Sequence, residues 1–208
     1  MAATQSSISA DEALKRLVAG NERFRLGKSN FARFDVRSLQ SLEASQQPYA
    51  TVLGCSDSRV PPELIFDSGL GDLFVIRVAG NVFSPEVAAS LQYAGAHLLT
   101  QLFVVLGHQN CGAVSAALQS RDNGKQELSR IQLLINNILP GLPPFDPALS
   151  SKARINQAVE SNVRWTVQRI VNTPEGQVRL AQGKMKIVGA IYELATGEVR
   201  FLNPELVN

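Results

Sequence analysis

The chain has 208 residues, of which 45% are hydrophobic and 18% charged, and its formal net charge is +2. Because Lys and Arg are scattered along the sequence, no basic face indicates binding to nucleic acid or to an anionic membrane. No apolar stretch approaches the roughly 20 residues that cross a bilayer, and residues 1–17 lack the features of a secretory signal, so we expect a cytoplasmic protein, with a trimmed targeting segment as the open alternative.

The first expected element is an amphipathic helix. Ser9 and Glu12 have the spacing of a capping box, in which the hydroxyl and the carboxylate each accept a hydrogen bond from a free backbone N–H group. Apolar residues then recur at helical spacing as far as Gly27, a residue typical of helix ends. Residues 28–48 are predicted to be irregular.

Five runs are predicted to be strands. Three continuous apolar runs, at 49–54, 73–80 and 102–107, are typical of strands that are buried on both faces, as in a parallel sheet covered by helices. Two further runs, at 185–194 and 198–202, are predicted to form a pair that closes the sheet.

Helices are predicted between these strands. Ser84 and Pro85 are typical of an N-cap followed by Pro at the first helical position, and the helix they begin should reach Leu98. Two more helical patterns, at about 125–138 and 151–171, flank a Pro/Gly-rich break. This alternation indicates an α/β fold with a mostly parallel central sheet flanked by helices.

A chain of this length is expected to form one domain with a core that needs no disulfides. Within it we distinguish an N-terminal helical arm and loop, residues 1–48, from the α/β domain proper, residues 49–208. Two cysteines do not make a disulfide scaffold, and a reducing compartment is the default.

Both cysteines are predicted to lie at the same edge of the sheet. Cys55 follows the first apolar run, and His108 and Cys111 follow the third. In open α/β sheets, ligands bind at the carboxyl edge of the strands. The H-x2-C spacing lets two donors converge on one point, as zinc ligand pairs do. A helix that begins at Gly112 would favour a thiolate at Cys111.

Other interpretations of these residues are weaker. A single buried cysteine usually behaves as a small hydrophobe, but here both cysteines and one of two histidines converge. A phosphatase-like loop from Cys55 to Arg59 would be too short to wrap a phosphate, and Asp57 would repel the oxyanion. A redox dithiol stays open in principle but lacks the C-x-x-C arrangement. His97 has no such neighbours and is interpreted as structural or solvent-facing.

The two motifs together resemble those of the β-class carbonic anhydrases. C-x-D-x-R at 55–59 and H-x2-C at 108–111 carry the resemblance first. Four longer stretches are also similar to that family and extend the resemblance over most of the chain: 55–81, 91–98, 102–114 and 187–199.

The resemblance implies an enzyme for the reversible hydration of CO2 to bicarbonate and a proton. Zn²⁺ would be bound by Cys55, His108 and Cys111, with a fourth position open to solvent. Zinc hydroxide would attack CO2, Asp57 would accept a hydrogen bond from it, and Arg59 would fix the Asp57 carboxylate. Since two thiolates offset the charge of the ion, we expect the pKa of bound water to exceed the ~7 of a three-histidine site and activity to rise toward alkaline pH.

The resemblance also bears on the state of Asp57. In some family members this aspartate moves onto zinc as a fourth ligand, and those members carry a Trp where this chain has Val52. Gln46 occupies the position of a glutamine that plant-like members aim at the substrate oxygen, although a solvated loop residue is the alternative. Both positions favour the plant-like, open arrangement with Asp57 held by Arg59.

Substrate-binding residues are likewise implied by the family. Phe74, Ala79 and Tyr93 map onto the apolar pocket for CO2, and Gly112 maps onto a backbone donor. Taken singly, Phe74 and Tyr93 are also typical of core residues. In the family these side chains cross from a neighbouring subunit, which implies a homo-oligomer, a dimer or a tetramer. Ala79 departs from the bulkier Val of plant-like members and leaves the shape of the pocket open.

Two alternative functions stay open from the sequence. Hydrolysis of carbonyl sulfide or carbon disulfide uses the same zinc ligands in some relatives, so the ligands do not separate it from CO2 hydration. A non-catalytic zinc protein or bicarbonate sensor is the other alternative, and the presence of Asp57 and Arg59 argues against it.

Overall fold

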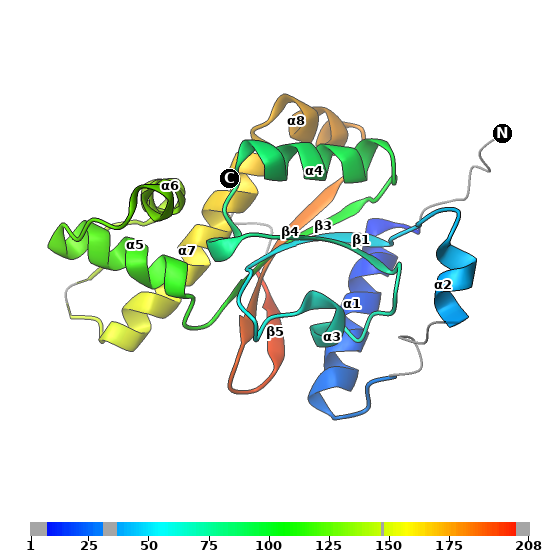
Figure 1. Cartoon of the computed structure of the whole chain (residues 1–208), viewed down its shortest axis with the longest axis horizontal. Helices are drawn as coiled ribbons and strands as arrows, with labels where there is room; N and C mark the ends of the chain where they lie inside the picture. The colour runs from blue at the N-terminus through cyan, green and yellow to red at the C-terminus, as the bar shows by residue number, and fades with distance from the viewer. Residues whose placement is uncertain (1–7, 31–36, 147, 203–208) are drawn as a thin grey trace.

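The computed structural model describes residues 8–30, 37–146 and 148–202. At its centre is a five-stranded sheet with the order β2-β1-β3-β4-β5 (Figure 1). Four strands are parallel and the last is antiparallel: β1 (Ala50–Gly54), β2 (Leu73–Arg77), β3 (Leu102–His108), β4 (Lys186–Glu193) and β5 (Glu198–Phe201). The predicted α/β class, with a mostly parallel sheet flanked by helices, is confirmed.

The central strands are buried on both faces, as their apolar runs predict. Every residue of β1 and β3 is buried. Because successive side chains of a strand point to opposite faces, each strand contributes to two cores. Val52 and its partner Val104 lie in the core beneath α1, whereas Leu53 and its partner Val105 lie in the core on the other face.

Helices cover both faces of the sheet (Figure 1). One face packs against α1 (Ala10–Arg25) and α3 (Pro62–Ile65). The opposite face packs against the larger set α4 (Pro85–Ala96), α5 (Gly112–Asn123), α6 (Ser129–Ile138), α7 (Ser151–Val171) and α8 (Pro174–Ala181). A further short helix, α2, spans Arg37–Leu42. No helix in the described ranges is long and apolar enough to cross a membrane.

The N-terminal helix is tied into the core of its own chain. Ser9 caps it by accepting a hydrogen bond from the Glu12 N–H at 3.2 Å, as the sequence predicts. Leu17 is fully buried, and Asn21 donates to the carbonyl oxygens of Ile65 and Gly197 at 3.1 and 2.9 Å. These bonds join α1 to two parts of the α/β domain that are distant in sequence.

Several element boundaries differ from the sequence predictions. The second strand ends at Arg77 instead of residue 80, because the chain turns into a short 3-10 helix, η2 (Ala79–Asn81), with Gly80 at φ 70°. The segment 28–48 was predicted to be irregular, but it contains α2. Helix α4 ends at Ala96, two residues before Leu98, and α6 begins at Ser129 instead of residue 125.

Candidate metal centre

Three buried donor side chains meet at the carboxyl edge of the sheet. Cys55 directly follows β1, His108 is the last residue of β3, and Cys111 is the N-cap of α5. Since β1 and β3 are adjacent and parallel, their carboxyl ends lie side by side. One ligand atom from each residue lies within 4.8 Å of the other two, and all three residues are at most 4% exposed. This spacing suits a single bound ion.

The imidazole of His108 presents one nitrogen to this cluster. Its Nδ1 lies 2.9 Å from the carbonyl oxygen of Gln109, which assigns the ring proton to Nδ1 and leaves the lone pair on Nε2. Nε2 is buried and has no hydrogen-bond partner among the residues that the structure describes. Buried polar atoms are nearly always paired, so this nitrogen lacks a partner that a metal ion would supply.

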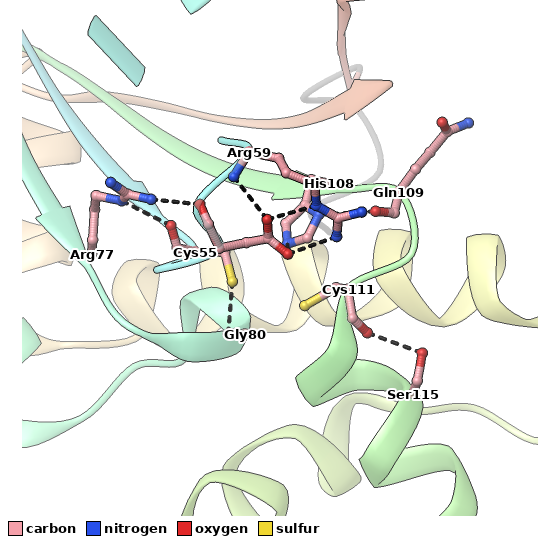
Figure 2. Close-up of polar contacts among 9 residues, drawn as sticks. Cys55, Arg59, Arg77, Gly80, His108, Gln109, Cys111 and Ser115 are labelled. Carbon is pink, nitrogen blue, oxygen red and sulfur yellow. Dashed lines mark hydrogen bonds and ion pairs between the residues drawn. The ribbon is translucent and has the colours of Figure 1, made fainter. Parts of the chain in front are cut away.

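The two sulfurs influence each other's ionisation. The hydrogen bond with the Cys111 thiol lowers the pKa of Cys55 against the effect of burial, and the Gly80 N–H, which lies 3.3 Å from the Cys55 sulfur, adds to the lowering (Figure 2). The same sulfur contact, together with burial, raises the pKa of Cys111. A divalent cation between them would stabilise both thiolates, and two thiolates with one imidazole are a donor set that zinc prefers. The residues present therefore fit zinc.

A carboxylate lies beside the donors and is held by an arginine. Asp57 Oδ1 accepts from Arg59 Nε at 2.9 Å and from the Arg59 backbone N–H at 3.0 Å, and Oδ2 accepts from Nη2 at 2.7 Å (Figure 2). These bonds hold the pKa of Asp57 well below its usual range. Its Oδ2 lies 3.9 Å from His108 Nε2. The carboxylate is therefore ionised, oriented and adjacent to the three donors.

The structure adds Arg77 and Gly80 to the site, and sequence reasoning missed both. Arg77, the last residue of β2, donates to the carbonyl oxygens of Cys55 at 3.0 Å and Asp57 at 2.6 Å (Figure 2). It thereby holds the loop that carries both side chains. An arginine that interrupts an apolar run just where a strand ends is the signal that could have identified it.

Two of the substrate-binding candidates lie next to the cluster. Ala79 precedes Gly80, whose N–H group contacts Cys55. Gly112 is exposed as the first residue of α5, directly after Cys111, as the predicted helix start requires.

The other candidates lie at the opposite end of the strands in the same chain. Phe74 pairs with Thr51 near the amino end of β1, and the ring of Tyr93 lies 6.0 Å from that of Phe74. Gln46 is exposed in the loop that precedes β1. His97 is exposed at the end of α4 with its ring 5.0 Å from Tyr93, in agreement with the structural or solvent-facing interpretation.

Comparisons with known proteins identify the family to which this chain is similar. A family model described as carbonic anhydrase matches residues 50–199. Carbonic anhydrase 2 of Mycobacterium tuberculosis is 37% identical over 186 residues, which cover 89% of each chain. The structure of the beta-carbonic anhydrase CcaA has a TM-score of 0.71 at 29% identity, over 94% of this chain and 97% of that chain. A tetrameric beta-carbonic anhydrase of Sordaria macrospora shares the fold, with a TM-score of 0.73 at 23% identity over 92% of this chain and 98% of that chain.

Proposed function

This chain belongs to the β-class carbonic anhydrase family, and we propose that it catalyses the reversible hydration of CO2 to bicarbonate and a proton, with Zn²⁺ bound by Cys55, His108 and Cys111. The observation that carries the proposal is the convergence of these three buried donors, one of them an unpartnered imidazole nitrogen, beside an ionised carboxylate. When bound, zinc would supply a Lewis acid that lowers the pKa of water and so makes it a nucleophile.

Asp57 orients the attacking water in this proposal. Its carboxylate can only accept hydrogen bonds, and three donors of Arg59 fix the direction in which its remaining lone pairs point. A water that donates a hydrogen bond to Asp57 directs a lone pair toward the carbon of CO2. The same three bonds oppose movement of Asp57 toward the ion, which supports the open arrangement.

The substrate pocket is proposed to form between subunits of a homo-oligomer. Ala79 and Gly112 lie beside the donors of their own chain. Phe74 and Tyr93 lie at the far end of the strands, where Tyr93 is 47% exposed and Phe74 is half-buried against the core of its own chain, so Tyr93 is the more available of the two to a neighbouring subunit. We place Gln46 in the same group, because it precedes the amino end of β1.

Subunit mixing tests this arrangement. Cys55→Ser removes a ligand but keeps Tyr93, whereas Tyr93→Ala keeps the ligands. If Tyr93 serves the neighbouring site, refolding the two inactive variants together restores part of the CO2 hydration activity. Sedimentation velocity on the same samples gives the number of subunits. An oligomer in which mixing restores no activity contradicts the crossed pocket, and a monomer contradicts the assembly.

A stopped-flow assay of CO2 hydration tests the activity itself. The zinc-loaded protein should hydrate CO2, lose activity when a chelator removes zinc and regain it when zinc is returned. Parallel assays for sulfide release from carbonyl sulfide and carbon disulfide separate the close alternative. A zinc-saturated protein that acts on none of the three substrates overturns the proposal and favours a non-catalytic sensor.

A further inference from the structure

Helix α7 lies unusually close to the strand that ends at His108. A Cβ atom built on Gly107 would lie 2.5 Å from Val163 Cγ2, and one built on Gly189 would lie 2.8 Å from Cγ1 of the same valine. Only glycine at these two positions allows the backbones of β3 and β4 to approach α7 this closely. The helix can therefore reach groups directly behind the metal centre, where its ribbon passes in Figure 2.

Because α7 lies this close, two of its buried polar residues can form hydrogen bonds with the turn η2. Asn162 and Thr166 are each 1% exposed and lie one turn apart on the helix. Asn162 Nδ2 donates to the carbonyl oxygen of Gly80 at 2.8 Å, and Thr166 Oγ1 donates to that of Asn81 at 3.2 Å. Both side chains thus hold the turn η2.

The turn they hold is conformationally demanding. Gly80 and Asn81 have φ values of 70° and 43°, and such left-handed backbone persists for a non-glycine residue only where its surroundings fix it. Within the described ranges the buried Oδ1 of Asn162 has no hydrogen-bond partner, so only the Nδ2 end of the amide is paired. The bond from Nδ2 to Gly80 is the contact that offsets part of the cost of burying this amide.

The opposite side of the turn contacts the metal centre. The Gly80 N–H group donates to Cys55 Sγ at 3.3 Å. A hydrogen bond to a ligand sulfur favours its thiolate form and helps to orient it, so the position of Gly80 influences how Cys55 would bind an ion.

We propose that Asn162, supported by Thr166, is a positioning residue for the metal ligand Cys55 and acts through the turn η2. This inference rests on the proposed zinc site. The helix holds the carbonyl side of the turn, and the turn directs its N–H group at the sulfur. Without Asn162 the turn relaxes, the N–H group leaves the sulfur, and the ligand loses its orientation.

Zinc affinity of four variants tests the proposal. Asn162→Ala and the nearly isosteric Thr166→Val remove one link each, whereas Thr166→Ser keeps the hydroxyl. Val167→Ala truncates a buried α7 residue that makes no hydrogen bond to the turn, and it controls for a general loss of core packing. Zinc dissociation constants come from competition with a chromophoric chelator, and the sulfur-to-cobalt absorption of Co²⁺-loaded protein reports on the bond to Cys55. Thermal unfolding of each metal-free variant measures stability.

We expect Asn162→Ala to weaken zinc binding by about 10-fold or more and to shift the sulfur-to-cobalt band, with a smaller effect of Thr166→Val. Thr166→Ser and Val167→Ala should stay within about 3-fold of the wild type, even where Val167→Ala lowers the melting temperature. Wild-type affinity in both Asn162→Ala and Thr166→Val, or an equal loss in Val167→Ala, overturns the inference. A wild-type protein that binds zinc but does not hydrate CO2 refutes only the proposed function, and one that binds no zinc refutes both.

Discussion

Gly107 offers a quantitative test of how the metal-bearing strand packs. It lies in β3 directly before His108, and its φ is not in the left-handed region, so the backbone itself accepts alanine. The added Cβ of Gly107→Ala would lie 2.5 Å from Val163 Cγ2 and 3.4 Å from Val159 Cγ1. Comfortable carbon contacts begin near 3.5 Å, so the first contact is too short by about 1 Å.

The neighbouring atoms cannot relieve this overlap easily. A valine on a helix is nearly confined to one rotamer, so the overlap is relieved mainly by moving α7 away from the sheet. Overpacking of this kind costs about 1–3 kcal/mol, which lowers the melting temperature of a chain of this size by about 2–12 °C. Val163→Ala alone should cost about 2 kcal/mol, because it removes two buried methyl groups and leaves a cavity.

The double variant tests whether the overlap between the added methyl and Val163 causes the loss of stability. In Gly107→Ala/Val163→Ala the added methyl enters the space that Val163 leaves, so its free energy of unfolding should lie within about 1 kcal/mol of that of Val163→Ala. Urea unfolding at a fixed protomer concentration, monitored by circular dichroism, measures the free energy of unfolding of the wild type and the three variants. If the two single effects simply add, the close approach of α7 does not govern this site.

Three further predictions follow from individual contacts. Asp57→Asn should lower kcat/KM for CO2 hydration by about 100-fold, while metal analysis finds an unchanged zinc content. A variant that loses its zinc would instead indicate that Asp57 is a metal ligand. Arg77→Met removes two hydrogen bonds to the loop that carries Cys55 and Asp57, and it should weaken zinc binding about 10-fold in chelator competition. An unchanged zinc affinity would show that the loop keeps its conformation without Arg77. Burial raises the pKa of Glu160, but hydrogen bonds from Arg164 and Arg200 outweigh it and hold the pKa below the ordinary 4.5. Its carboxylate therefore stabilises the fold above that pH, and Glu160→Gln should lower the free energy of unfolding in urea by about 1 kcal/mol at pH 7. This loss should shrink as the pH falls below about 4, and a loss that does not change with pH would contradict the prediction.

The pattern of apolar residues was sufficient to predict the strands that are covered on both faces. The continuous apolar runs identified β1 and β3 because both faces of these strands are covered. Helix α8 has the same signal as α4, an N-cap hydroxyl followed by Pro, with Thr173 accepting from the Gly176 N–H, and could have been predicted. The four-residue α3 is too short for periodicity to reveal.

The donors of the site could be predicted, but Asn162, which positions one of them, could not. Cys55, His108 and Cys111 each follow an apolar run, and the carboxyl ends of parallel strands share one edge of a sheet, which was enough to predict that they lie together. Asn162 lies more than 80 positions from Gly80, and the bond between them depends on the close packing of α7, which no local pattern reports. Arg77 is different, because it interrupts an apolar run and could have been singled out, but the run 73–80 was interpreted as one continuous strand.

The zinc content of the purified, reduced protein tests the central claim most directly. The account predicts about one zinc per chain by inductively coupled plasma mass spectrometry, a large loss of zinc in Cys111→Ser, and CO2 hydration that disappears and returns with the metal. A wild-type protein without stoichiometric zinc, or one whose activity survives complete removal of the metal, would contradict the account.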